Sequence, residues 1–110
     1  AKYSNEMLNL LLHQTRRWKI PSGLPAGTKC ANKTGENDSC QNDVAIVYGK
    51  KTTYIVCIFS QTYESSGVSG IRALSSKIYK VNVLLSRFED LLFFCKNINR
   101  KHLLKSTFKT

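Results

Sequence analysis

Lys33, Thr34 and Gly35 follow one another at the end of a strand-like run, residues 27–32, and two more strand-like runs come after them. An extended segment would present these residues as an ammonium group, a hydroxyl group and a stretch of backbone without a side chain. We predict that the three groups stand side by side on a strand that lines a groove. The triplet alone is a weak signal, because a chain this rich in the three residue types gives it by chance with odds on the order of one in twenty.

A second chemical pattern is Ser106-Thr107-Phe108-Lys109, in which a serine precedes a lysine by three residues. With this many serines and lysines, about one such match is expected by chance. His13 and His102 have no carboxylate or cysteine partner at a recognisable spacing, so we interpret both as surface residues.

The elements that must position these residues are readable from the apolar spacing. Residues 4–14 predict a short helix with Ser4 as its N-cap. Residues 18–25 contain two prolines and read as an ordered turn that Trp18 and Ile20 can pack down. Residues 28–34, 44–48 and 53–59 predict strands, the last two buried on both faces, with a loop at 36–41 and a hairpin at 49–51.

The C-terminal half predicts helix. Residues 65–81 place Val68, Ile71, Leu74, Ile78 and Val81 at helical spacing, so an amphipathic helix should lie on the sheet. Residues 83–95 continue with a second helical stripe, in which 91–95 fit a buried strand equally well, whereas 97–110 are basic and poorly patterned. The predicted fold class is therefore α+β, with a three-stranded antiparallel sheet flanked by helices and a basic, helical or irregular extension at 83–110.

The order Leu-Pro-Ala-Gly at 24–27, Lys-Thr-Gly at 33–35, two apolar strands and a final helix resembles the C-terminal third of a class A serine β-lactamase. The resemblance covers residues 3–82 continuously. It implies a partial β-lactamase or transpeptidase-like fold and a penicillin-recognising serine hydrolase, found in the secreted or cell-envelope compartment. It implies no cofactor.

Carried over by this resemblance, Lys33 would supply a cation for the substrate carboxylate and the proton network, and Thr34 a hydroxyl hydrogen bond to that carboxylate. Gly35 would let the substrate lie along the strand, and the backbone N–H of Glu36 would be an oxyanion-hole donor. Many family members also carry an arginine where this chain has Asn42, so that extra anchor is missing.

Two further signatures of the resembled family, a Ser-Asp-Asn element and a loop glutamate, are absent from this sequence. Tyr3-Ser4-Asn5 has the form of a related element, but it lies too close to Lys33 and reads as a helix cap. Ser-Thr-Phe-Lys at 106–109 is a sequence that class A enzymes often have at their nucleophile motif. Residues 83–110 are therefore either an extension with an incidental match or a displaced N-terminal family segment, with Ser106 and Lys109 as catalytic candidates.

Composition bears on nucleic-acid binding, metal binding, disulfides and membrane segments. The net charge of +10 comes from 17 basic and 7 acidic residues, spread along the chain, and a solvated basic surface explains it without nucleic acid. The four cysteines include no Cys-x-x-Cys pair, so no metal site is predicted. We favour buried reduced cysteines, with a Cys30–Cys40 bridge as the alternative. No membrane span and no signal peptide are recognisable.

The strand at 53–59 would leave one apolar sheet edge open, which proteins rarely tolerate. We predict that this edge is covered by residues 83–110, by a second copy of the chain or by a complementary polypeptide. The functional hypothesis is a β-lactamase-like hydrolase fragment that forms one wall of a β-lactam site and is inactive alone. The alternative is a remnant that binds penicillin, peptidoglycan peptides or a protein partner without catalysis.

Overall fold

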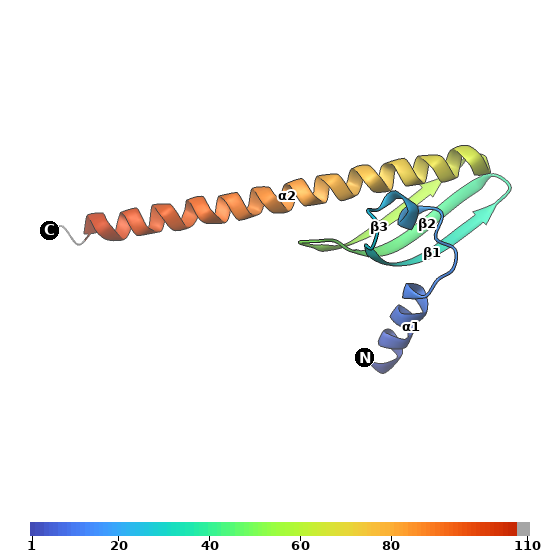
Figure 1. Ribbon diagram of the computed structural model, residues 1–110, viewed down its shortest axis with the longest axis horizontal. Helices are drawn as coiled ribbons and strands as arrows, with labels where there is room; N and C mark the ends of the chain where they lie inside the picture. Colours follow the sequence, from blue (N-terminus) through green and yellow to red (C-terminus); the bar gives the residue numbers. More distant parts are fainter. Residues whose placement is uncertain (108–110) are drawn as a thin grey trace.

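The computed structural model describes the backbone of residues 1–107 and the side chains of residues 1–88. Its elements follow in the order α1 (Lys2–Leu12), η1 (Ile20–Gly23), β1 (Lys29–Asn37), β2 (Cys40–Tyr48), β3 (Thr53–Ser60) and α2 (Glu64–Thr107) (Figure 1). The strands form one antiparallel sheet in the order β1-β2-β3. The predicted α+β class and the predicted sheet are confirmed.

The strands are longer than the apolar runs that predicted them. β1 and β2 pair as far as Asn37 and Cys40, so the predicted loop at 36–41 is wrong. The side-chain Oδ1 of Asn37 accepts hydrogen bonds of 2.9 Å from the backbone N–H groups of Ser39 and Cys40. The polar residues therefore close a tight turn instead of forming a long loop.

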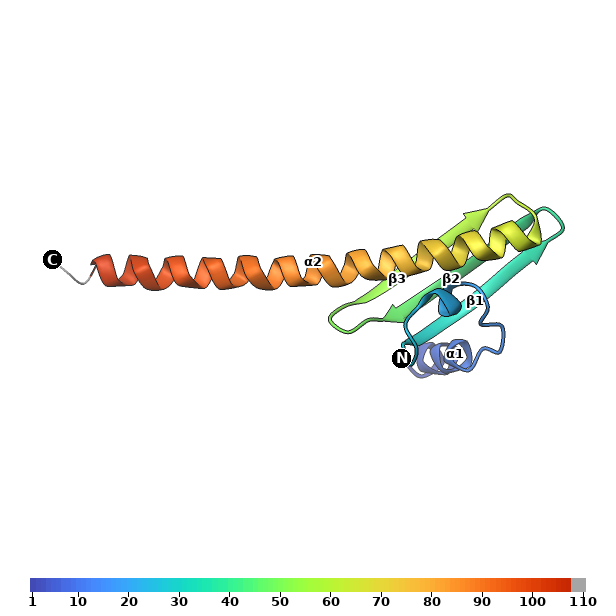
Figure 2. The same ribbon diagram turned by 45° about the horizontal axis from the view of Figure 1, so that its top comes forward.

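One face of the sheet carries η1 and the first half of α2, and the core lies there (Figure 2). The buried apolar residues are Ile20, Cys30, Ala45, Val47, Val56, Ile58, Ile71 and Tyr79. α2 approaches η1 so closely that a Cβ on Gly23 would lie 2.3 Å from the backbone oxygen of Arg72. The hydroxyl of Ser75 donates to the backbone oxygen of Ile20 at 2.9 Å at the same crossing.

This close crossing explains why the predicted buried stripe of α2 is partly wrong. Ile71 is buried as predicted, but Leu74 and Val81 are 44% and 51% exposed. The helix turns Ser75 and Tyr79 toward the sheet, because a small residue is needed where two backbones approach.

α1 lies against β1 on the side of the sheet away from α2 (Figures 1 and 2). It begins at Lys2, with Ala1 as its N-cap, so the prediction of Ser4 as the cap is wrong. The helix leaves the rest of this face open. Ile55 and Phe59 of β3 are 75% and 72% exposed, which contradicts the prediction that helices cover both faces.

α2 is one continuous helix where we predicted two helical stripes and a poorly patterned tail. It projects far beyond the sheet, and the molecule measures 74 × 36 × 22 Å (Figure 1). Its distal half therefore does not cover the outer edge of β3, and that alternative is wrong. Covering by a second copy or by another polypeptide stays a prediction. Within residues 1–107, no helix combines the length and apolarity needed to cross a membrane.

Candidate functional site

The candidate site lies on β1, which is an edge strand of the sheet. Lys33 and Gly35 are exposed and their register partners on β2 are Val44 and Asn42. The other side of β1 has no strand partner among the described residues, so the backbone groups that point outward are open to a ligand.

Two side chains show which backbone groups of β1 point to this open edge. The carbonyl oxygen of Cys30 accepts a hydrogen bond from Nη1 of Arg17 at 3.2 Å, and that of Thr34 accepts one from Nζ of Lys33 at 2.6 Å. In an antiparallel pair, outward and inward residues alternate along the strand. The backbone N–H of Glu36, two residues after Thr34, therefore faces the same edge as the Lys33 ammonium.

Thr34 departs from the predicted arrangement. It is 4% exposed on the face that carries the core, and its Oγ1 is buried without a hydrogen-bond partner. Lys33 projects from the opposite face, so the ammonium and the hydroxyl are not presented side by side. The reason is the strand itself, since successive side chains alternate between its faces.

Gly35 has no structural reason to be glycine within this chain. A Cβ placed on it would meet only Cβ of Asn42, at an ordinary 4.0 Å. Its backbone φ angle is not positive. Among the described glycines, a positive φ is found at Gly27. The missing side chain instead leaves clear space beside the exposed end of β1.

A charged cluster that sequence reasoning missed anchors this end of β1. Lys19 is fully buried, and its Nζ donates to Oε2 of Glu36 at 2.7 Å and to the backbone oxygen of Asn42 at 3.1 Å. Arg16 also pairs with Glu36, whose side chain is 26% exposed. The hydrogen bond from Lys19 is the main cause that lowers the pKa of Glu36 below 4.5. Lys19 stands between Trp18 and Ile20, and this apolar flanking was the one signal of its burial.

Asp43 ties η1 to the sheet beneath this cluster. Its carboxylate accepts a 2.9 Å hydrogen bond from the backbone N–H of Ile20 and a 3.3 Å bond from the side-chain amide of Asn32. Burial raises the pKa of Asp43 above 3.8 despite these donors. The remaining amide oxygen of Asn32 is buried without a partner.

The other predicted catalytic pair is not brought to β1. Ser106 lies in the last turn of α2, at the end that projects away from the sheet (Figure 1). At about 1.5 Å of rise per residue, the helix carries Ser106 roughly 30 Å beyond Ser86. Lys109 lies outside the described residues.

Three cysteines have described side chains, and all three are free thiols. Cys30 is buried as predicted, and burial raises its pKa to about 11. Cys57 is exposed, which corrects the prediction that it is buried. Among the described side chains, no group of His, Cys, Asp and Glu residues is arranged to hold a metal ion.

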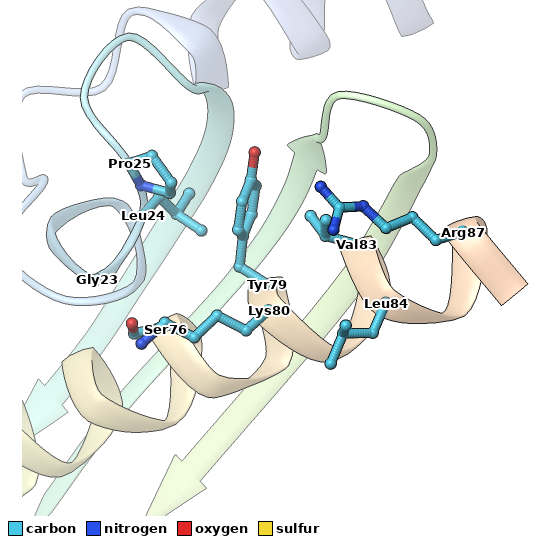
Figure 3. A pocket seen from close by; sticks show the side chains of 9 residues that line it. All are labelled: Gly23, Leu24, Pro25, Ser76, Tyr79, Lys80, Val83, Leu84 and Arg87. Atoms are coloured by element: carbon cyan, nitrogen blue, oxygen red, sulfur yellow. The ribbon is translucent and has the colours of Figure 1, made fainter.

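Five hollows on the described residues lie away from residues 33–36. A hollow of about 620 Å³ is formed by η1 and its following turn on one side and by α2 on the other (Figure 3). Most of its lining is apolar, and the basic side chains of Lys80 and Arg87 also line it. Four other hollows on this part of the chain are also lined by residues other than 33–36. Residues 33–36 lie on the open edge of β1, and the predicted groove beside them stays a prediction.

Comparisons with known proteins agree with this fold. A family described as the beta-lactamase enzyme family matches residues 1–81. No curated protein sequence matches the chain. Among solved structures, a beta lactamase from Burkholderia vietnamiensis superposes with a TM-score of 0.69 at 18% identity, covering 76% of this chain and 33% of its own.

Two further structures give the same result. PBP-A superposes with a TM-score of 0.65 at 22% identity over 73% of this chain and 31% of its own, and a mutant of it was solved as an acyl-enzyme complex with penicillin G. The beta-lactamase from Streptosporangium roseum superposes with a TM-score of 0.62 at 21% identity, over 78% of this chain and 34% of its own. The chain thus spans about a third of these relatives. Since the family match covers 81 of the 110 residues, the chain belongs to the beta-lactamase enzyme family.

Proposed function

We propose that residues 33–35 are the Lys-Thr-Gly element of this family and that β1 forms one wall of a site for β-lactam antibiotics. The observation that carries the proposal is that the Lys33 ammonium and the backbone N–H of Glu36 face the same open edge of β1. The ammonium would bind the carboxylate of the ligand. The N–H would stabilise the oxyanion that forms when the lactam carbonyl is attacked in the complete domain.

The buried hydroxyl of Thr34 supports this assignment. A buried polar group without a partner calls for an explanation, and a functional role is a common one. Rotation about the Cα–Cβ bond would turn Oγ1 toward the open edge, where a ligand carboxylate could accept its hydrogen bond. In this proposal Thr34 changes its rotamer when the ligand binds.

Lys19 has a positioning role in this proposal. It lies against Asn42, where many relatives carry an arginine, but Glu36 already neutralises its charge. Its ion pair fixes the side chain of Glu36 and so the orientation of the backbone N–H at the end of β1.

Binding of a fluorescent penicillin, followed by anisotropy, tests the wall. Lys33→Ala should weaken binding about tenfold, which corresponds to about 1.4 kcal/mol for a hydrogen bond to a charged group. Lys29→Ala is the matched control, because Lys29 is an exposed lysine on the same strand. Gly35→Ala should fold normally and bind more weakly, since its Cβ has free space in the unliganded chain. Equal affinities for wild type, Lys33→Ala and Gly35→Ala would overturn the proposal.

Turnover is a separate question. We expect no hydrolysis of nitrocefin by the isolated chain, because the candidate nucleophile Ser106 lies in the last turn of α2, at the end that projects away from the sheet. If the chain does hydrolyse nitrocefin and Ser106→Ala abolishes this activity, residues 83–110 act as a displaced nucleophile segment, supplied by another copy.

The second candidate is a non-catalytic module of the same fold that binds penicillin, peptidoglycan peptides or a protein partner. The position of Ser106 in the last turn of α2, at the end of the helix that projects away from the sheet, favours it. Reversible, saturable binding of labelled penicillin without any covalent mass increase, even when a second copy is in excess, would support this alternative.

The bare edge of β3 implies a further partner. We propose that a second copy or a complementary polypeptide pairs with this edge, in a secreted or cell-envelope location typical of the resembled enzymes. Light scattering across a range of concentrations tests self-association, and a mass that stays monomeric throughout would leave the complementary polypeptide as the partner.

A further inference from the structure

We propose that the outer face of α2 binds the surface of a membrane that contains anionic phospholipids. This face is defined by an apolar stripe of five side chains on the solvent side of the helix: Leu74, Val81, Leu84, Leu85 and Phe88. The inference does not depend on the proposed function of β1, which lies in another part of the molecule.

The stripe is exposed although its residues are large and apolar. The exposed fractions of its five side chains run from 44% for Leu74 to 62% for Phe88. Leu74, Val81 and Phe88 are seven residues apart, so they lie along one line on the helix surface. The sequence continues the same spacing at Leu91, Leu92 and Cys95. Soluble monomers rarely leave a contiguous apolar surface of this kind without a partner.

The charges beside the stripe indicate what kind of partner fits. Lys77, Lys80 and Arg87 are exposed, and the sequence has no acidic residue from 65 to 88, with Glu89 and Asp90 following directly after Phe88. A helix with leucine and phenylalanine on one face and basic residues beside them is typical of segments that lie in the interface of an anionic bilayer. A second copy would bring like charges together along the same face, so charge complementarity favours the anionic surface.

The hollow beside the stripe adds a place for a lipid. Leu84 belongs both to the stripe and to the lining of this hollow, whose apolar walls include Leu24 and Val83 (Figure 3). Lys80 and Arg87 also line it. About 620 Å³ is enough room for part of an acyl chain, while Lys80 and Arg87, whose charged ends point in different directions in Figure 3, can each bind a headgroup phosphate.

The position of α2 makes this face accessible. The helix extends away from the sheet, so neither the strands nor α1 stand between its outer face and a flat surface (Figures 1 and 2). The helix would lie along the membrane and not across it, in agreement with its failure to qualify as a membrane span over the described residues.

Cosedimentation of the full chain with vesicles tests the proposal. We expect binding to vesicles of phosphatidylcholine with about one third phosphatidylglycerol, and little binding to pure phosphatidylcholine. Each basic residue near an anionic surface contributes about fivefold to the partition coefficient, so Lys77→Gln/Lys80→Gln/Arg87→Gln should lower it on the order of a hundredfold. The control Lys2→Gln/Lys29→Gln/Lys50→Gln removes the same charge from other elements and should lower it less than tenfold.

Insertion of the stripe is measured separately. Phe88→Trp should show a blue-shifted emission and quenching by brominated lipid with the anionic vesicles, whereas the native Trp18 should show neither. Equal loss of binding in the two triple variants would show a nonspecific effect of net charge and overturn the proposal. Equal binding to neutral vesicles, or a dimer that buries the stripe and does not bind vesicles, would also overturn it.

Discussion

Removing Glu36 should destabilise the protein more than removing its partner Lys19, although the two residues form one ion pair. The asymmetry arises from burial, because the Lys19 side chain is fully buried and that of Glu36 is 26% exposed. Glu36→Gln leaves a cation in the interior with only neutral oxygen acceptors. Lys19→Met leaves a carboxylate that still pairs with Arg16 and reaches water.

The magnitudes follow from these surroundings. Breaking a fully buried ion pair costs about 3–5 kcal/mol when an unpaired charge remains inside. In Glu36→Gln the amide oxygen still accepts a bond from Lys19 and water reaches the site, so we expect about 2 kcal/mol. Lys19→Met keeps the packing of the aliphatic stem and loses hydrogen bonds worth about 1 kcal/mol.

Urea unfolding followed by the fluorescence of Trp18, the one tryptophan of the chain, measures the difference. With a slope of about 1–2 kcal/mol per molar urea, Glu36→Gln should lower the midpoint by roughly 1–2 M and Lys19→Met by about half as much. Lys29→Met is the control and should stay within about 0.5 kcal/mol of wild type.

The double variant Lys19→Met/Glu36→Gln gives the sharpest result. It removes both charges, so it should be more stable than Glu36→Gln alone. Two results would refute the reasoning about the buried cation. One is a double variant whose loss of unfolding free energy equals the sum of the two single losses, and the other is a larger loss for Lys19→Met than for Glu36→Gln.

Three other measurements probe different parts of the fold. The pKa of Glu36 is lowered from 4.5 in the folded chain, so its charge contributes to stability above pH 4.5 and this contribution is lost as the pH falls through the lowered pKa. The unfolding free energy lost between about pH 5 and about pH 3 should therefore be smaller in Glu36→Gln than in wild type. Gly70→Ala should stabilise α2 by about 0.5–1 kcal/mol because nothing lies within 4 Å of the new Cβ, whereas Gly67→Ala should destabilise it because that Cβ would lie 2.7 Å from Gln41; equal changes in melting temperature would contradict the packing of α2 on β2. Peptide mapping after brief treatment with iodoacetamide at pH 8 should find Cys57 modified and Cys30 unmodified, since Cys30 is buried with a pKa of about 11; rapid modification of Cys30 would show that the core opens.

The local structure of the sheet was predictable from the sequence. The apolar runs and the short hairpin gave the three strands in the correct order, because strand spacing and turn residues act locally. The Leu-Pro-Ala-Gly turn and the Lys-Thr-Gly triplet indicated the family, and the match over residues 1–81 agrees. The strand ends were not predictable from apolar content, because the Asn37 side chain closes a turn that composition alone reads as a loop.

Long-range packing decided the rest. Apart from its apolar neighbours Trp18 and Ile20, nothing local marks Lys19 as the most deeply buried cation of the described chain, since its partners Glu36 and Asn42 lie 17 and 23 residues away. The same holds for the buried stripe of α2, where contact with η1 selected Ser75 over Leu74. The sequence determined which segments are strands and helices through local periodicity. The tertiary structure alone decided which side chains face one another, because burial and pairing depend on residues that are distant in the chain.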